Sequence, residues 1–362
     1  MRRLILSVML GGALLVAAGV SWMLLRSRGG ATLPVVEVPF LNTAVGVAYV
    51  GSQACRECHA TEAETYHHTG MARSMAAIDL ANEPPDGTFE HAKSQRRYQV
   101  LRRDGRLWHR ELSLSAGADE VVWSEYPVAY VVGSGRHSRS YLIEADGFLI
   151  ESPITWYAAL RAWGMSPGYD RADHPGFERE AGEGCLTCHA GQSRALDRSL
   201  HRMQIDEAAI GCERCHGPGS LHVAAHRTET PSANYHERVR RVDRTIVNPV
   251  HLSRERSEAI CQQCHLRSEA TVVAPGRAID DFRPGLPLEQ FVHNYRLNVP
   301  DAQMTVVGHV EQLHFSRCYT ASGTLTCLTC HDPHAGPTTT DSVATRTAQC
   351  RVCHQPSACR VD

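Results

Sequence analysis

Six copies of the pentapeptide Cys-x-x-Cys-His are the residues of this chain whose types and spacing could do chemistry. In a helical turn, side chains at positions i, i+3 and i+4 lie on one side. Two thiols at this spacing can therefore bond the vinyl groups of one haem while the histidine reaches its iron. The copies, called motif 1 to motif 6 below, span Cys55–His59, Cys185–His189, Cys212–His216, Cys261–His265, Cys327–His331 and Cys350–His354.

The pattern predicts six covalently bound haem c groups. With 14 Cys and 21 His in 362 residues, random placement would give on the order of 0.03 such pentapeptides. Zinc ribbons and disulfide frameworks also use paired cysteines, but neither needs a histidine after every second cysteine. The predicted attachment residues are Cys55, Cys58, Cys185, Cys188, Cys212, Cys215, Cys261, Cys264, Cys327, Cys330, Cys350 and Cys353. Cys318 and Cys359 lie outside the motifs, as free or packing thiols or as a structural pair.

An export segment precedes the motifs. Met1-Arg2-Arg3 is followed by an uncharged, largely apolar run of 22 residues from Leu4 to Leu25. This run can cross a hydrocarbon layer of about 30 Å and exceeds a signal-peptide core of roughly 7–15 residues. Thioether-linked haem is made outside the bacterial inner membrane, so we expect a protein on the periplasmic side, anchored by residues 4–25. Ala17-Ala18-Gly19 leaves cleavage to a soluble periplasmic form open.

Composition limits the partners and the kind of core. A net charge of −2 offers no basic surface for nucleic acid, so none is expected as a partner. Aromatic residues make up only 6% of the chain, and porphyrin plates could supply the missing apolar packing. We therefore predict a mostly α and irregular fold with a haem-packed core and a small antiparallel β insertion.

The motifs are unevenly spread, which suggests the organisation of the chain. We expect a signal or anchor (1–28), a Gly- and Pro-containing linker (29–50) and a multihaem domain (51–362), with a β-rich insertion at about 88–155 and a haem-dense part at about 180–356. Hairpins are predicted where Asp104-Gly105 and Asp146-Gly147 interrupt apolar runs, with further strands at 121–123 and 128–132 bounded by Pro127 and Gly133. Short helices should carry the motifs, most clearly at Ser253–Ile260 with Ser253 as N-cap.

Further stretches accompany the motifs: Tyr49–Ser52, His68–Ala72, Gly133–His137, Met165–Asp170, His174–Phe177, Cys215–Gly219 and Cys330–His334. With them the chain resembles the multihaem cytochrome c family related to cytochrome c-554, whose members often carry doubled Cys-x-x-Cys-His segments. The resemblance implies electron transfer through closely spaced haems.

Each motif histidine is a predicted proximal iron ligand: His59, His189, His216, His265, His331 and His354. For the opposite side, Pro333 fixes the backbone before His334, which resembles the family's distal ligands, and a Gly-Pro-Gly turn could carry His222 to another haem. His68 (or its neighbour His67), His137 and His174 lie in the stretches that carry the resemblance. His309 and His314 compete for the last place, for which we take His314. Methionine is the other possible ligand type, at Met71, Met75, Met165 or Met304.

Two functions remain open. In the first, the protein carries electrons between a membrane quinol-oxidising complex, or another cytochrome, and periplasmic redox partners. In the second, one five-coordinate haem reduces or oxidises a small nitrogen or sulfur compound. Arginines beside His137 and His174 could pair with haem propionates in the first case or clamp an anionic substrate in the second: Arg136, Arg139, Arg171 and Arg179.

Overall fold

The computed structural model describes residues 39–113, 121–197, 199, 201–227, 242–266, 268–296, 308–335 and 343–354. The expected anchor at residues 4–25 lies outside the described residues, as do Met304 and Cys359. Within the described ranges, no helix has both the length and the apolar character required to cross a bilayer.

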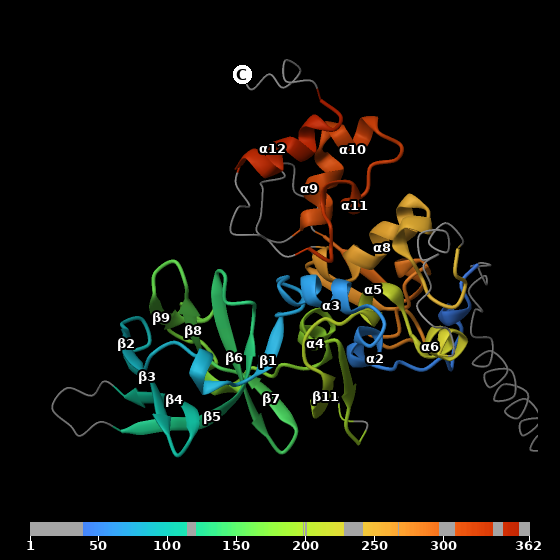
Figure 1. The fold of residues 1–362 in the computed structure, drawn as a ribbon. Helices are drawn as coiled ribbons and strands as arrows, with labels where there is room; N and C mark the ends of the chain where they lie inside the picture. Colours follow the sequence, from blue (N-terminus) through green and yellow to red (C-terminus); the bar gives the residue numbers. More distant parts are fainter. Residues whose placement is uncertain are drawn as a thin grey trace, which may run out of the picture. The chain divides into compact units, whose positions relative to one another are not determined.

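Two short helices precede a run of nine strands, and the rest of the chain consists of short helices with two pairs of strands among them (Figure 1). The α-helices are α2 (Ser52–Arg56), α3 (Ala60–His67), α4 (Glu183–His189), α5 (Glu213–His216), α6 (Ser220–His226), α8 (Arg254–His265), α9 (His309–Phe315), α10 (Arg317–Ala321), α11 (Cys327–Cys330) and α12 (Val343–Arg351). The strands are β1 (Met75–Ala77), β2 (Gly87–His91), β3 (Arg96–Arg103), β4 (Arg106–Ser113), β5 (Val122–Val132), β6 (Ser138–Ala145), β7 (Phe148–Glu151), β8 (Ile154–Tyr157), β9 (Ala162–Met165), β10 (Gln192–Ala195), β11 (Met203–Glu207), β12 (Ala270–Val273) and β13 (Val292–Tyr295). Five 3-10 turns are η1 (Leu41–Thr43), η2 (Leu80–Asn82), η3 (Gly176–Glu178), η4 (Pro249–His251) and η5 (Leu288–Gln290).

The largest element is a nine-stranded antiparallel sheet, so the predicted fold class, mostly α and irregular, is wrong. Its strands follow the order β2-β3-β4-β5-β6-β8-β9, with β1 paired to β5 and β7 to β6. The sheet curls so that its end strands β2 and β9 come into contact, and the Trp163 indole N–H on β9 donates to the carbonyl of Pro85, just before β2, at 2.9 Å. The stretch between motif 1 and motif 2 thus folds as a substantial β structure rather than as a small insertion.

Both predicted hairpins are confirmed. β3 pairs with β4 across Asp104-Gly105, and β6 pairs with β7 across Asp146-Gly147. In each turn both residues have positive φ, at 51° and 70° in the first and 52° and 83° in the second. An Asp-Gly pair accepts this conformation at low cost, and its twist matches that of the flanking strands.

The two apolar runs on either side of Pro127 form one strand, β5, instead of two. Before the proline, β5 pairs with β4, with Trp108 opposite Pro127. After it, β5 pairs with β6, and β1 joins at Tyr130 to Val132. Proline lacks a backbone N–H, so it is tolerated where the hydrogen-bond ladder passes from one neighbour to another.

The sheet has a core made of side chains, so this part of the chain does not depend on the predicted haem-packed core. Leu107, Tyr141 and Ile154 have no exposed surface and pack with other apolar residues of the sheet. Complete burial of such a side chain contributes roughly 1.5–3 kcal/mol. Alternating inward positions on several strands can therefore stabilise this region without porphyrin.

A second cluster attaches motif 2 to the sheet. Leu186, which lies between the two cysteines of motif 2, is 1% exposed and packs with Leu149 and Met75 of the sheet. The Ser74 hydroxyl also donates to the carbonyl of His189 at 2.7 Å. The helix that carries this motif is therefore held on the sheet through its middle and its C-terminal end.

The other motif helices are short, as predicted, and α8 is the longest of those described. Ser253 caps it by accepting a hydrogen bond from the Arg256 N–H at 3.4 Å, which confirms the predicted start. The helix continues to His265 and so contains all of motif 4. Its residue Ile260 packs with Phe40 and Val247, from distant parts of the chain.

His109 on β4 is a buried polar group inside the sheet. Its Nδ1 lies 2.7 Å from the Ser152 hydroxyl, and its ring packs between Tyr141 and Trp163. Burial lowers the pKa of His109 from 6.5 to about 3. The imidazole therefore stays neutral in the folded protein.

This buried histidine should make the protein less stable in mild acid. Between pH 6.5 and about 3, the unfolded chain binds a proton at His109 that the folded chain does not, so stability falls as the pH falls. From pH 7 to pH 5 the loss is about 2 kcal/mol. His109→Asn should remove this part of the pH dependence, measured by denaturant unfolding of the holoprotein followed by far-UV circular dichroism. His251→Asn, at an exposed histidine, should keep the wild-type dependence; equal slopes in all three proteins would contradict the prediction.

Candidate haem-binding sites

Each motif adopts the helical turn that its spacing predicts. Motifs 2 and 4 lie within α4 and α8. In the other four, the histidine N–H donates to the carbonyl of the first cysteine, at 2.9 Å for His59, 3.1 Å for His216, and 3.0 Å for both His331 and His354. Two sulfur atoms and one imidazole therefore leave each turn on the same side.

Three motif histidines have a second imidazole ring facing them. The ring centroids of His59 and His222 lie 6.1 Å apart at an interplanar angle of 24°, and those of His216 and His334 lie 5.8 Å apart at 14°. Metal–imidazole bonds of about 2 Å on both sides of one ion place two axial rings about 6 Å apart. These two pairs therefore have the spacing of axial ligands to a single iron.

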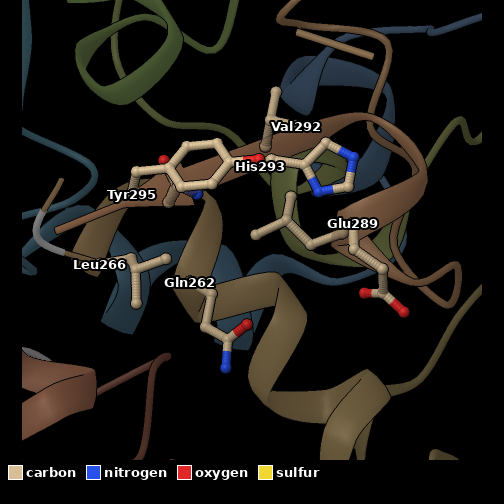
Figure 2. Close-up of a pocket in the computed structure, with 8 residues that line it drawn as sticks. Gln262, Leu266, Glu289, Val292, His293 and Tyr295 are labelled. Carbon is tan, nitrogen blue, oxygen red and sulfur yellow. The ribbon is translucent and has the colours of Figure 1, made fainter. Parts of the chain in front are cut away.

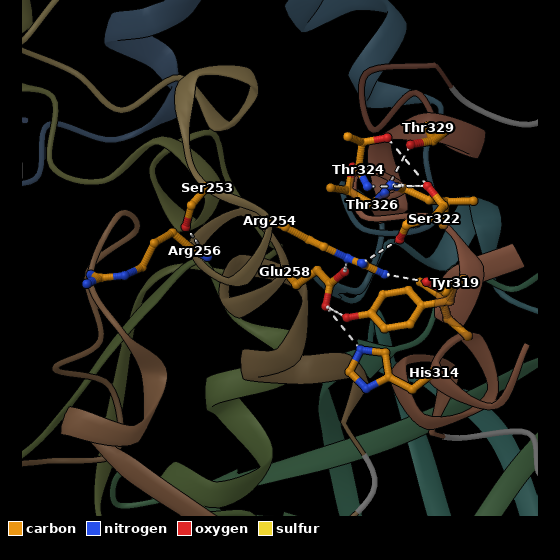
Figure 3. A network of polar contacts seen from close by, with 12 residues as sticks. Ser253, Arg254, Arg256, Glu258, His314, Tyr319, Ser322, Thr324, Thr326 and Thr329 are labelled. Carbon is orange, nitrogen blue, oxygen red and sulfur yellow. Dashed lines mark hydrogen bonds and ion pairs between the residues drawn. The ribbon is translucent and has the colours of Figure 1, made fainter.

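The third pair differs from the expected choice of histidine. His265 faces His309, with centroids 5.1 Å apart at 24° and Nδ1 atoms 3.2 Å apart. His314 lies elsewhere, since its Nε2 is 3.0 Å from the Glu258 carboxylate and its ring stacks on Tyr319 at 4.2 Å (Figure 3). The structure thus brings His309, and not His314, to motif 4.

Hydrogen bonds orient two of these rings. His216 directs its Nδ1 to the carbonyl of Val247 at 2.8 Å, and a carbonyl can only accept, so the proton is on Nδ1. His222 directs its Nδ1 to the Asp243 carboxylate at 3.0 Å. In both rings Nε2 is left as the atom with a lone pair, which is what an iron ligand requires.

Burial keeps several of these imidazoles neutral. Loss of water contact lowers the pKa of four histidines, three of them in motifs: His189, His216, His222 and His265. A protonated ring cannot bind a metal. The protein environment therefore favours the ligating form at neutral pH.

The remaining predicted distal histidines lie away from the motif rings. His174 is buried and uses both nitrogens, with Nε2 3.0 Å from the Tyr98 hydroxyl and Nδ1 accepting from the Gly176 N–H at 3.1 Å. His68 is exposed and lies beside His67, and His137 is exposed before β6. In the described part of the chain, none of these three forms a ring contact with a motif histidine.

The histidines of motifs 2, 5 and 6 have no second imidazole ring facing them among the described residues. Nδ1 of His189 is buried and has no hydrogen-bond partner among the described residues. Nε2 of His354 lies 3.9 Å from the sulfur of Cys318 on α10. His331 lies close enough to His265 to influence its protonation.

Thiols from different motifs lie side by side. Three contacts are close enough for sulfur hydrogen bonds, between Cys55 and Cys212, Cys188 and Cys264, and Cys261 and Cys327. They place motif 1 beside motif 3, motif 2 beside motif 4, and motif 4 beside motif 5.

Two longer-range contacts connect the rest. Cys215 lies near both cysteines of motif 4, and Cys330 lies near both cysteines of motif 6. Motif 3 therefore lies beside motifs 1 and 4, and motif 5 lies beside motifs 4 and 6. Motif 2 lies beside motif 4 and also beside motif 3, where the Arg214 guanidinium donates to the carbonyl of Thr187 at 2.5 Å. This arrangement differs from the order in sequence.

Two surface hollows border motif residues. The larger, of about 280 Å³, lies beside Gln262 of motif 4 and is bounded by Leu266, His293 and Tyr295 (Figure 2). The other, of about 190 Å³, is lined in part by Cys212 and His67. Open space therefore adjoins two of the attachment turns.

Buried carboxylates are the functional residues that sequence reasoning missed. Glu213 lies between the cysteines of motif 3 and accepts hydrogen bonds from the N–H groups of Val50, at 2.9 Å, and of Gly51 and Gly219, each at 2.7 Å. Burial raises its pKa, although these N–H groups act in the opposite direction. Glu213 thus ties the segment before motif 1 to motif 3, and its place inside a motif was the only available signal.

The arginines beside His137 and His174 are predicted to pair with haem propionates or with an anionic substrate. Arg139 instead pairs with Glu83 at 3.3 Å, and Arg179 pairs with Glu151 at 2.8 Å. Arg171 lies 3.5 Å from Asp173. These three guanidinium groups have protein carboxylates as partners.

Taken together, the residues fit haem c. Each motif offers two thiols and an imidazole from one turn, and two motif rings have a second ring at axial spacing. The donor set is that of thioether-linked haem with histidine ligands.

Comparisons with known proteins point to the same cofactor. Residues 168–217, which contain motifs 2 and 3, match the family described as cytochrome c554 and c-prime, and residues 320–358, which contain motifs 5 and 6, match the doubled CXXCH motif. The predicted resemblance is confirmed: the chain has the features of a multihaem c-type cytochrome with covalently bound haem c. Motifs 1 and 4 lie outside both matched segments.

Among solved structures, the Outer Cell Wall Cytochrome OcwA aligns with 68% of this chain at 15% sequence identity and a TM-score of 0.40. The aligned part covers 45% of that cytochrome, so the chain spans less than half of its length. No curated protein matches the chain.

Removing the charge of Glu213 should loosen the contact between motifs 1 and 3. In Glu213→Gln an amide group replaces one oxygen that faces backbone N–H donors, and the loss of hydrogen bonds to a charged group should lower the free energy of unfolding by about 1.5–3 kcal/mol. Denaturant unfolding of the holoprotein, followed by circular dichroism, measures this. Glu57→Gln is the matched control, because Glu57 lies between the cysteines of motif 1 but is exposed. Equal losses in the two variants would contradict the role of Glu213.

Proposed function

We propose that this protein is an exported electron-transfer cytochrome with six covalently bound haems. The observation that supports it best is the pair of facing imidazole couples, His59 with His222 and His216 with His334, at 6.1 and 5.8 Å. A haem closed by two histidines has no position for substrate and can only exchange electrons. When bound, each haem supplies a one-electron iron couple.

The proposed ligands follow from the motifs and the facing rings. All twelve motif cysteines attach haem, and all six motif histidines bind iron from the proximal side. His222 completes the coordination begun by His59, His334 that of His216, and His309 that of His265. His68, His137, His174 and His314 stay predictions for the haems of motifs 2, 5 and 6.

The proposed electron path follows the thiol contacts. Neighbouring motifs 1, 3, 4, 5 and 6 form a continuous series, and motif 2 joins it at motifs 3 and 4. Each electron-transfer step between neighbouring haems is short, because the attachment turns of different motifs are in contact. Ligation by two histidines favours low reduction potentials.

The proposed partners are a quinol-oxidising membrane complex or another cytochrome and a periplasmic redox protein. Residues 1–28 would export the chain, with 4–25 as anchor, 29–50 as linker and 51–362 as the multihaem domain. Support comes from the apolar run after Arg2-Arg3 and from haem c attachment, which takes place outside the inner membrane.

Intact mass spectrometry tests the haem count and the fate of the N-terminus. After maturation in a bacterial host with haem c assembly, the protein should gain about 616 Da for each of six haems. Retention of residues 4–25 is expected from the anchor proposal. A gain corresponding to fewer haems would contradict the count, and a mass lacking the first residues would contradict the anchor.

Removing one distal ligand should open one iron. In His334→Ala the haem of motif 3 should become high-spin, adding a signal from about one sixth of the haem iron in low-temperature EPR, relative to wild type. His251→Ala, which removes an exposed histidine, should leave the spectrum unchanged. No new high-spin signal in His334→Ala, or an equal one in the control, would contradict the assignment. A wild-type high-spin signal that shifts with nitrite, hydroxylamine or nitric oxide would favour the enzymatic alternative.

A further inference from the structure

A carboxylate lies directly behind one of the proposed iron ligands. Oδ2 of Asp243 is 3.0 Å from Nδ1 of His222 and 2.9 Å from Nε2 of His226, both on α6. No feature of the sequence pointed to Asp243, which is distant from the motifs along the chain.

The position of this carboxylate is fixed from its other side. Oδ1 of Asp243 accepts hydrogen bonds from the backbone N–H of Thr245 at 2.7 Å and from the Thr245 hydroxyl at 2.6 Å. The side chain is 33% exposed, so it is partly shielded from water. Oδ2 is therefore held toward the two histidines.

The hydrogen bond decides which nitrogen of His222 can bind a metal. The carboxylate accepts a hydrogen bond from Nδ1–H, so the proton stays on Nδ1 and the lone pair is on Nε2. The ring of His222 faces that of His59 at 6.1 Å. A carboxylate in this place fixes the ring and makes the imidazole a stronger electron donor to its metal.

The pair of His216 and His334 at motif 3 has no carboxylate behind its proximal histidine in the described structure. His216 directs its Nδ1 to the neutral carbonyl of Val247 at 2.8 Å, and the described structure gives it no carboxylate partner on that nitrogen. A more strongly donating ligand stabilises the oxidised iron, so the two neighbouring haems should differ in potential.

We propose that Asp243 is a positioning residue that holds His222 on the iron of motif 1 and lowers the reduction potential of that haem below that of motif 3. The inference rests on the proposed pairing of His59 and His222. Electrons would then pass from motif 1 to motif 3, in the direction of the proposed path.

The same three side chains could also be a divalent-metal site, since their ligand atoms lie within 4.8 Å of one another. The hydrogen bonds argue against this. Both histidine nitrogens share one carboxylate oxygen, and Thr245 occupies the other. The carboxylate of Asp243 thus already has hydrogen-bond donors for both of its oxygens without a metal ion.

The test uses the six-haem holoprotein and carbon monoxide, which binds reduced haem only when an axial position opens. Losing the partner of a metal-bound histidine usually weakens metal affinity about 10–100-fold, so in Asp243→Asn carbon monoxide should bind one haem faster than in wild type by up to about that factor. The potential of the same haem should rise in a redox titration. Asp243→Glu should restore most of the wild-type behaviour, and Thr245→Val, which keeps the charge but loosens it, should lie between.

Two further variants separate the possible causes. His222→Ala should open the haem completely; if it does not, the pairing of His59 and His222 is wrong and the inference falls with it. If His222→Ala opens the haem but Asp243→Asn leaves both potential and carbon monoxide binding unchanged, only the role of Asp243 is overturned. His226→Gln should match wild type, because the glutamine amide can still donate a hydrogen bond to Oδ2 of Asp243. If His226→Gln has an effect equal to that of Asp243→Asn, the carboxylate merely places α6. If a chelator shifts the reduction potential of the wild-type protein, the carboxylate acts through a bound metal. Either result overturns the proposal.

Discussion

One covalent constraint governs the rest of this structure: a haem attached through Cys-x-x-Cys-His is fixed to a single helical turn. That turn provides two sulfurs and one imidazole, and geometry prevents the same turn from reaching the opposite face of the iron. The second ligand must therefore come from another part of the chain. His222 reaches motif 1 and His334 reaches motif 3 across long sequence separations. Long-range contacts follow from the chemistry of attachment.

The protein holds these turns with ordinary packing and with buried charge. Leu186 fixes motif 2 to the sheet through apolar contacts, and Glu213 fixes motif 3 through three backbone N–H groups. Glu258 fixes α8 to the segment that follows it in the structure, because its carboxylate binds His314 and Tyr319 as well as Arg254 of its own helix (Figure 3). A buried carboxylate is stable only when several donors surround it. Such groups therefore hold motif helices against segments that are distant in the sequence.

Local patterns predicted local structure well. Asp104-Gly105 and Asp146-Gly147 formed hairpins because both residues tolerate positive φ, and Ser253 capped α8 through its own hydroxyl. The extent of the sheet was not predicted, because a low aromatic content suggests a shortage of core residues. The choice between His309 and His314 was also beyond local reasoning, because Glu258, far away in sequence, binds His314.

By itself, the sequence determined the kind of cofactor and predicted its points of attachment, because thioether bonds and the proximal ligand depend only on residues within five positions of each other. It also indicated His222 and His334 as candidates for a second ligand. Only the tertiary structure decided which motif each of these rings faces, which motifs are neighbours, and that Asp243 stands behind His222. Those relations depend on how distant segments pack, and the spacing of residues along a chain does not encode distances of that kind.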